Sequence, residues 1–144
     1  MGIVVLLISA YLIYKYFEEK RDYEERLRRI VNQGYLFTPS EFFEYKFDLT
    51  RRFNIPGVYI LYNISKDMHY IGQGKKVFNR VQNHFSGRGN GDVYADYKYG
   101  DQFEIKIIPL HSSGFYTLNE LERNLIFSYG SYKRGYNKTR GNLT

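Results

Sequence analysis

The stretch that decides the fold is GVYILYNISKDMHYIGQG, which runs from Gly57 to Gly74. Its two halves are rich in β-branched and aromatic residues and flank the turn-forming residues ISKD, a pattern that predicts a β-hairpin. Tyr59 and Tyr70 fall on the two strands, and each lies close to a glycine. We expect both hydroxyls to lie on the same face of the sheet.

The chain after the hairpin continues with clear helix and strand signals. Residues 75–85 (KKVFNRVQNHF) predict an amphipathic helix, and residues 101–110 (DQFEIKIIPL) predict a third strand. A glycine-rich loop and a short helix lie between them. Residues 117–130 predict a last helix that a capping box opens, with Thr117 and Glu120. The fold class is therefore α+β, with helices packed against a small three-stranded sheet.

The first 17 residues carry an apolar stretch without a charged side chain between Gly2 and Tyr14. A helix over residues 3–17 spans roughly 22 Å, less than the roughly 30 Å hydrocarbon core of a bilayer. Because the stretch is apolar on every face and basic residues follow it, we expect one N-terminal membrane anchor with the rest of the chain on the cytoplasmic side. The alternative is a buried or self-associating helix of a soluble cytoplasmic protein.

The segment between this stretch and the hairpin has two parts. Residues 18–30 interleave acidic and basic side chains, which predicts a solvated helical stalk. Thr38 then begins a second helix as N-cap, with Pro39 in the first turn and Glu41 closing a capping box. Its apolar residues are expected to pack on the following domain: Phe42, Phe43, Phe47 and Leu49. The predicted division is a hydrophobic helix (1–17), a charged stalk with the capped helix (18–55) and a main domain (56–144).

Composition narrows the function classes. The chain has no cysteine, which excludes disulfide frameworks, thiolate zinc sites and cysteine nucleophiles. Its formal charge is +6, and residues 57–144 hold twelve basic against seven acidic side chains, together with many of the 16 Tyr and 11 Phe. A basic surface rich in aromatic rings suits nucleic acid, although many soluble proteins are mildly basic.

Six polar residues of the main domain form a candidate set for cleaving a phosphodiester: Tyr59, Tyr70, Arg80, His84, Glu122 and Asn137. Arg80 and His84 are four residues apart and share a helix face. A carboxylate such as Glu122 can hold Mg²⁺, and one carboxylate favours a single ion. An arginine stabilises the transition state, while a tyrosine or histidine moves the proton of the attacking water.

Residues 57–140 resemble the GIY-YIG nuclease family. The first motif is Gly57-Val58-Tyr59, with Val where Ile is common, the second is Tyr70-Ile71-Gly72, and GYNKTRGN resembles the closing Gly-Tyr-Asn motif. The spacings also fit the family pattern: ten residues from Tyr70 to Arg80, four from Arg80 to His84 and fifteen from Glu122 to Asn137.

The resemblance implies a DNA endonuclease with a three-stranded antiparallel sheet and one Mg²⁺ or Mn²⁺ on Glu122. It implies that Tyr59 or Tyr70 is the general base and that Arg80 stabilises the transition state. His84 then assists proton transfer or contacts phosphate, and Asn137 buttresses the site.

One departure from the family is Val93, which stands where some members carry a second histidine. Further DNA contacts are expected from Lys75, Arg88, Lys98 and Lys138. His69 is interpreted as a surface residue or as one that contacts the site residues without touching the substrate. No sequence feature indicates a function for His111.

The expected function is a metal-dependent DNA endonuclease at the cytoplasmic face of a membrane that acts on incoming or foreign DNA. The alternatives are a non-catalytic DNA-binding or membrane-associated adaptor and a soluble structure-selective repair or recombination nuclease. Since no helix-turn-helix or zinc-finger pattern is present, we expect either weak sequence preference or recognition supplied by a homodimer or a separate partner.

Overall fold

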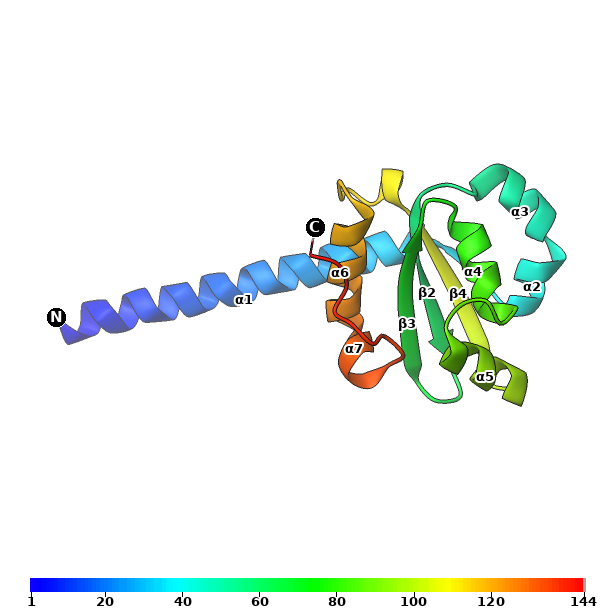
Figure 1. Cartoon of the computed structure of the whole chain (residues 1–144). Coiled ribbons are helices and arrows are strands. Elements are labelled where there is room, and N and C mark those ends of the chain that lie inside the picture. The colour runs from blue at the N-terminus through cyan, green and yellow to red at the C-terminus, as the bar shows by residue number, and fades with distance from the viewer. Residues whose placement is uncertain (144) are drawn as a thin grey trace.

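The computed structural model describes residues 1–143, apart from the side chains of Leu49, Arg52 and Phe53. A long helix leads into a domain in which helices cover both faces of one antiparallel sheet (Figure 1). In chain order the elements are α1 (Gly2–Asn32), β1 (Tyr35–Phe37), α2 (Pro39–Glu44), α3 (Lys46–Phe53), β2 (Gly57–Asn63), β3 (Met68–Gly74), α4 (Val77–Phe85), α5 (Gly91–Tyr99), β4 (Phe103–Pro109), the 3₁₀ turn η1 (Leu110–Ser112), α6 (Leu118–Tyr129) and α7 (Ser131–Arg134).

The sheet has four strands in the order β1-β4-β2-β3, so the prediction of three strands is wrong. The additional strand is β1, which pairs with β4 through Tyr35↔Ile107, Leu36↔Lys106 and Phe37↔Ile105. Only three residues long, β1 is too short for a periodic pattern to reveal it. The predicted hairpin and third strand are confirmed as β2, β3 and β4.

Two core clusters lie on opposite faces of the sheet, and β2 contributes to both. Tyr59 and Leu61 pack against α2, α4 and α5, whereas Val58 and Ile60 pack against α6 and the end of α1. Successive side chains of a strand point to opposite faces. A central strand covered on both sides therefore has an uninterrupted apolar sequence, as GVYILY does.

The predicted helices of the main domain are confirmed, with Val77, Phe78 and Val81 buried on the packing side of α4. The capping box of α2 is present, since Glu41 N donates to Thr38 Oγ1 and Thr38 N donates to Glu41 Oε2. The segment forms two helices, α2 and α3, where the sequence suggested one.

The aromatic residues of this segment differ in how they pack. Phe42 is buried and stacks on Phe78, whereas Phe43 is partly buried and Phe47 is exposed. The expected packing of Leu49 lies outside the described side chains.

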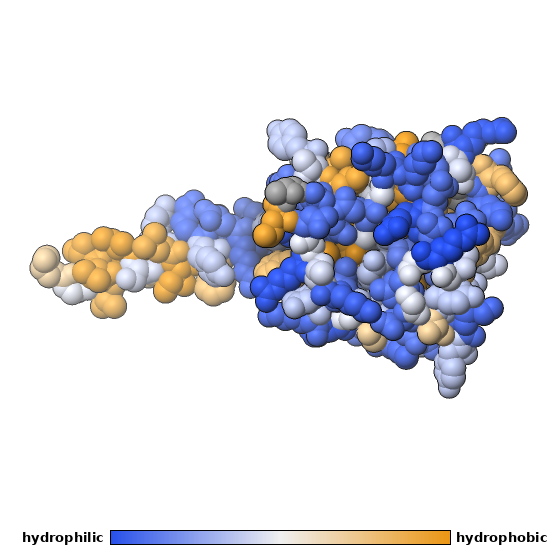
Figure 2. Space-filling model, in the orientation of Figure 1, coloured by the Kyte–Doolittle hydropathy of each residue, from blue (hydrophilic) through white to orange (hydrophobic). Residues whose placement is uncertain are grey.

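Helix α1 projects away from the domain, and only Leu27, Ile30 and Val31 are buried (Figure 1). The large apolar side chains of residues 3–17 lie on the surface, 54% to 76% exposed, and form the apolar end seen in Figure 2. None of the helices in the described part of the chain is long enough and apolar enough to cross a membrane. The membrane anchor expected at residues 3–17 is therefore not supported. The physical reason is that Lys15, Glu18 and Glu19 end the apolar stretch before the roughly 20 residues that a span needs.

The burial of Phe42 and the exposure of Phe47 predict mutational effects of different size. Phe42 is 1% exposed, so we expect Phe42→Ala to lower the free energy of unfolding by about 3–5 kcal/mol, measured by urea denaturation. Phe47 is 81% exposed, so Phe47→Ala is the matched control, with a change within about 0.5 kcal/mol. Equal effects of the two substitutions would contradict this packing.

Candidate active site

The register of β2 and β3 brings the two motif tyrosines together. Tyr59 lies opposite Gly72, and Tyr70 lies opposite Leu61. Because Tyr59 and Leu61 share a face of β2, Tyr70 shares that face with them. The ring centroids of Tyr59 and Tyr70 are 6.2 Å apart. The expectation that both tyrosines occupy one face is confirmed.

Glycines in β3 leave room for two of the polar side chains. A Cβ on Gly72 would lie 2.2 Å from Tyr59 Oη, so the tyrosine ring occupies the space of the missing side chain. A Cβ on Gly74 would lie 3.1 Å from Cβ of Arg80, which is exposed at the surface of α4. These close contacts give a physical reason for the glycines that follow Tyr70.

His84 lies beneath the tyrosines and is held at both ring nitrogens. Its side chain is buried, 2.6 Å from Tyr59 Oη through Nε2, and the backbone N–H of Asn90 donates to Nδ1 over 2.8 Å. Since Nδ1 accepts, the neutral ring carries its proton on Nε2 and donates to Tyr59 Oη. Burial lowers the pKa of His84 to about 4, with a smaller contribution from Arg80, so the ring is neutral at pH 7.

The glycine-rich loop after α4 has a structural task that sequence analysis missed. A Cβ on Gly89 would lie 2.3 Å from His84 Nδ1, so only glycine lets the loop backbone approach the ring this closely. Asn90 also caps α5, because its side chain accepts from the backbone N–H groups of Asp92 and Val93. The loop therefore fixes both the position and the tautomer of His84.

Burial dominates the ionisation of the two tyrosines. It raises the pKa of Tyr59 well above the usual value, and the neighbouring Tyr70 adds to the rise, whereas Arg80 lowers it. Burial also raises the pKa of Tyr70, again opposed by Arg80. Each hydroxyl therefore stays protonated at pH 7 until other charges stabilise its phenolate.

Glu122 comes from α6, on the other side of the sheet, and reaches the same region at the edge of β3. Burial is the main cause of the raised pKa of both tyrosines, and the charge of Glu122 adds to the rise. Gln73 Nε2 donates to Glu122 Oε2 over 2.5 Å and to Asn119 Oδ1 over 2.7 Å. Burial raises the pKa of Glu122, while Gln73 and Arg80 oppose that rise. Gln73 was missed by sequence analysis, although its position between Gly72 and Gly74 was a usable signal.

Asn137 forms hydrogen bonds with the backbone of β3. Its Oδ1 accepts from Ile71 N and its Nδ2 donates to Ile71 O, both over 2.8 Å. Tyr136 N donates to His69 O in addition. Because β3 is an edge strand, its outer backbone groups need partners, and the closing segment supplies them.

Glu122 fits a single metal ion but offers no complete cage. Among the described residues, no group of three or more His, Cys, Asp or Glu side chains could hold an ion. Glu122 is the carboxylate of the site, and a nearby cation would offset the penalty that burial places on its charge. Mg²⁺ keeps several waters and needs one or two carboxylates, so this donor set is sufficient.

The cations predicted to bind DNA all have exposed side chains, and they differ in how many residues separate them from the candidate site residues in the sequence. Lys75 follows Gly74, and Arg88 precedes Gly89. Lys138 follows Asn137 and lies 3.6 Å from a carboxylate oxygen of Asp92. Lys98 lies in the last turn of α5.

The remaining positions of interest lie outside the site. Val93 is fully buried and contacts no solvent. His69 stacks on Tyr62, with centroids 4.4 Å apart, and lies 4.8 Å from the ring of Tyr129, so it packs in an aromatic group. His111 is exposed in η1.

The geometry predicts that His84 stays neutral and protonated on Nε2 from pH 8 to about pH 5. The ¹⁵N chemical shifts of its ring, followed by NMR through a pH titration, check this. Because the unfolded chain takes up the proton near pH 6.5 and the folded chain near pH 4, the stability that His84 contributes is present above this window and is lost as the pH falls through it. A charged ring at pH 6, or a proton on Nδ1, would contradict the geometry.

Comparison with known proteins agrees with this arrangement. Residues 55–137 match the family model of the GIY-YIG catalytic domain, which covers more than half of the chain. No curated protein and no solved structure matched the chain. The matched range contains both tyrosine motifs, Arg80, His84, Glu122 and Asn137. The chain therefore belongs to the GIY-YIG family of nucleases.

Proposed function

We propose that this protein is a DNA endonuclease that hydrolyses phosphodiester bonds with one divalent cation bound at Glu122. The observation that carries the proposal is the convergence of Tyr59, Arg80, His84 and Glu122 at β3 from separate elements on both faces of the sheet. Family membership supports the same reaction class.

Glu122 is the residue that would hold Mg²⁺ or Mn²⁺. When bound, the ion supplies Lewis-acid stabilisation of charge on the phosphate. Gln73 fixes one carboxylate oxygen and leaves the other without a hydrogen bond among the described residues. This arrangement directs the free oxygen for coordination and orients the carboxylate.

Tyr59 is the proposed general base for the attacking water. Its hydroxyl oxygen accepts the Nε2–H of His84, and Arg80 favours its ionised form. Since Nδ1 of His84 already accepts from Asn90, a neutral His84 has no free lone pair for the proton of Tyr59. Tyr59 would therefore act as the phenolate, after losing its own proton to solvent, and His84 would stabilise this phenolate as a hydrogen-bond donor until the phenolate accepts the proton of the attacking water.

Arg80 is the residue proposed to stabilise the phosphorane-like transition state, because it is exposed beside the site and carries a permanent charge. Lys75, Arg88, Lys98 and Lys138 are proposed to contact DNA phosphates, with Lys98 farthest along the chain from the catalytic residues. Asn137 is proposed to buttress the site through Ile71. The expectation that the enzyme acts on incoming DNA rested on a membrane anchor, which the described helices do not support.

The carboxylate is tested by Glu122→Gln, which keeps the size of the side chain and an oxygen that can accept from Gln73. We expect Mg²⁺-dependent nicking of supercoiled plasmid to disappear, measured on agarose gels. Burial raises the pKa of Glu122 above its value in the unfolded chain, so the ionised carboxylate lowers the stability of the folded protein at pH 7. The variant removes this charge and should be at least as stable as the wild type at pH 7.

The matched control for this variant is Glu120→Gln in the first turn of the same helix, which should leave nicking unchanged. If Glu122→Gln nicks plasmid as fast as the wild type, the proposal that Glu122 holds the metal ion is wrong.

The base is tested by Tyr59→Phe, which keeps the ring on Gly72 and removes only the hydroxyl. A loss of about 10²–10⁴-fold in the cleavage rate is expected. Tyr62→Phe on the same strand is the control, because the Tyr62 hydroxyl donates to Asp67 outside the site. If Tyr70→Phe shows the large loss and Tyr59→Phe does not, Tyr70 is the base.

A further inference from the structure

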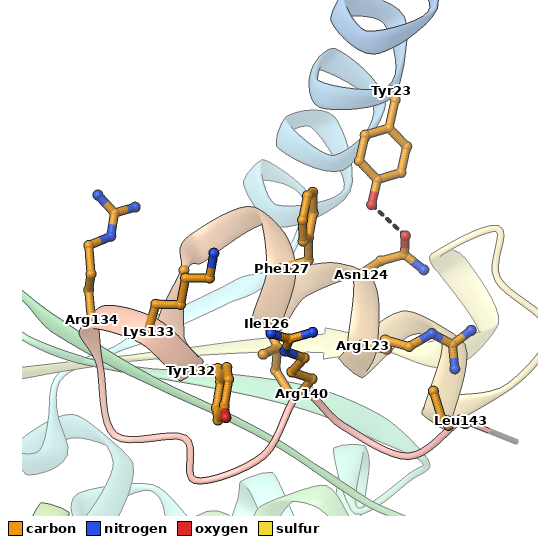
Figure 3. A pocket seen from close by; sticks show the side chains of 11 residues that line it. Tyr23, Arg123, Asn124, Ile126, Phe127, Tyr132, Lys133, Arg134, Arg140 and Leu143 are labelled. Carbon is orange, nitrogen blue, oxygen red and sulfur yellow. Dashed lines mark hydrogen bonds between the residues drawn. The ribbon is translucent and has the colours of Figure 1, made fainter.

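A basic groove lies along α6 (Figure 3). Its lining includes none of Tyr59, Tyr70, Arg80, His84, Glu122 and Asn137. It has a volume of about 660 Å³ and is bounded by α6, α7, the C-terminal segment and Tyr23 of α1. Glu122 of α6 bonds to Gln73 at the sheet, whereas the next residue, Arg123, lines the groove. None of the cations already proposed to contact DNA lines it.

The charge of the groove is uniformly positive. Among the described residues, four cations and no side-chain carboxylate line it: Arg123, Lys133, Arg134 and Arg140. None of the four forms an ion pair with a described carboxylate. One nitrogen of Arg123 donates to the carbonyl of Asn142, which leaves its other donors for a ligand. An unneutralised group of this kind favours a polyanion.

Aromatic side chains form the second feature of the groove. Phe127 is 79% exposed and Tyr132 is 41% exposed, with the Arg140 guanidinium 5.4 Å from the centre of the Tyr132 ring. Arg123 and Phe127 are four residues apart and lie on one side of α6. Phe127 and Tyr23 also line a second groove of about 480 Å³, which continues along α1 past Lys20 and Arg28.

We propose that this groove binds an unpaired strand of DNA, with phosphates on the cations and bases stacked on Phe127 and Tyr132. Single strands combine a charged backbone with exposed base faces, and basic grooves with aromatic platforms bind them without sequence preference. A duplex hides its base faces and gains nothing from the rings. Binding of a single strand to this groove does not require the proposed nuclease function. Only the statement that the strand is part of the nuclease substrate rests on that function.

The test measures binding directly, by fluorescence anisotropy of a labelled oligothymidine of about 12 nucleotides and of a duplex of the same length. The protein used is residues 1–144 with Glu122→Gln, and divalent cations are omitted, so that cleavage does not interfere. Phe127→Ala with Arg134→Gln removes one ring and one charge from the groove. Phe47→Ala with Arg51→Gln on α3 is the matched control, because Phe47 is equally exposed and Arg51 lies at the surface.

The groove variant should bind the single strand at least about fivefold more weakly than the control, while duplex binding changes by a smaller factor. The slope of log K against log salt for the single strand should fall by about 0.7 for the lost phosphate contact. Equal affinities of the groove variant and its control overturn the proposal. Equal losses for the single strand and the duplex overturn the unpaired-strand assignment.

Binding and cleavage fail separately in this design. If the wild type nicks plasmid but the groove variant binds like its control, the nuclease function stands and the groove proposal is wrong. If the groove variant binds more weakly but the wild type does not cleave DNA, the groove proposal stands and the nuclease function is wrong.

Discussion

The packing of the Tyr59 ring over Gly72 is the contact on which the site depends. It requires the β2–β3 register observed, because a slip of one residue would move Tyr59 to the opposite face. With the ring in that place, its hydroxyl meets Nε2 of His84, and the loop backbone at Gly89 and Asn90 closes on Nδ1. A position without a side chain in one strand thus fixes a chain of contacts that reaches from the hairpin to α5.

The same contacts make the site electrostatically expensive for the folded protein. Burial raises the pKa of Tyr59, Tyr70 and Glu122 and lowers that of His84, so in each case the protein interior disfavours the charged form. Groups whose ionisation is penalised in the resting state respond strongly to an added cation or phosphate. Arg80 already opposes part of the penalty, and a divalent ion near Glu122 would oppose more of it. In the proposed nuclease, such a site would trade stability for reactivity, as active sites often do.

Local sequence patterns predicted much of this structure, since the hairpin, α4, α6 and the Thr38 cap depend on neighbouring residues. They failed where contacts join distant positions. Strand β1 takes its identity from β4, far along the chain, and Gln73 meets Glu122 across 49 positions. The role of Gly89 depends on a histidine packed beneath it. At residues 3–17 the apolar pattern predicted a membrane span that Lys15, Glu18 and Glu19 shorten below the required length.

The most direct measurement of the central claim is the rate at which the wild-type protein nicks supercoiled plasmid as Mg²⁺ is titrated, with EDTA as the blank. One carboxylate and the absence of a larger group of ligands among the described residues predict a hyperbolic dependence on a single ion. A sigmoidal dependence would contradict the one-ion site. The absence of cleavage at every concentration of Mg²⁺ and Mn²⁺ would contradict the nuclease itself.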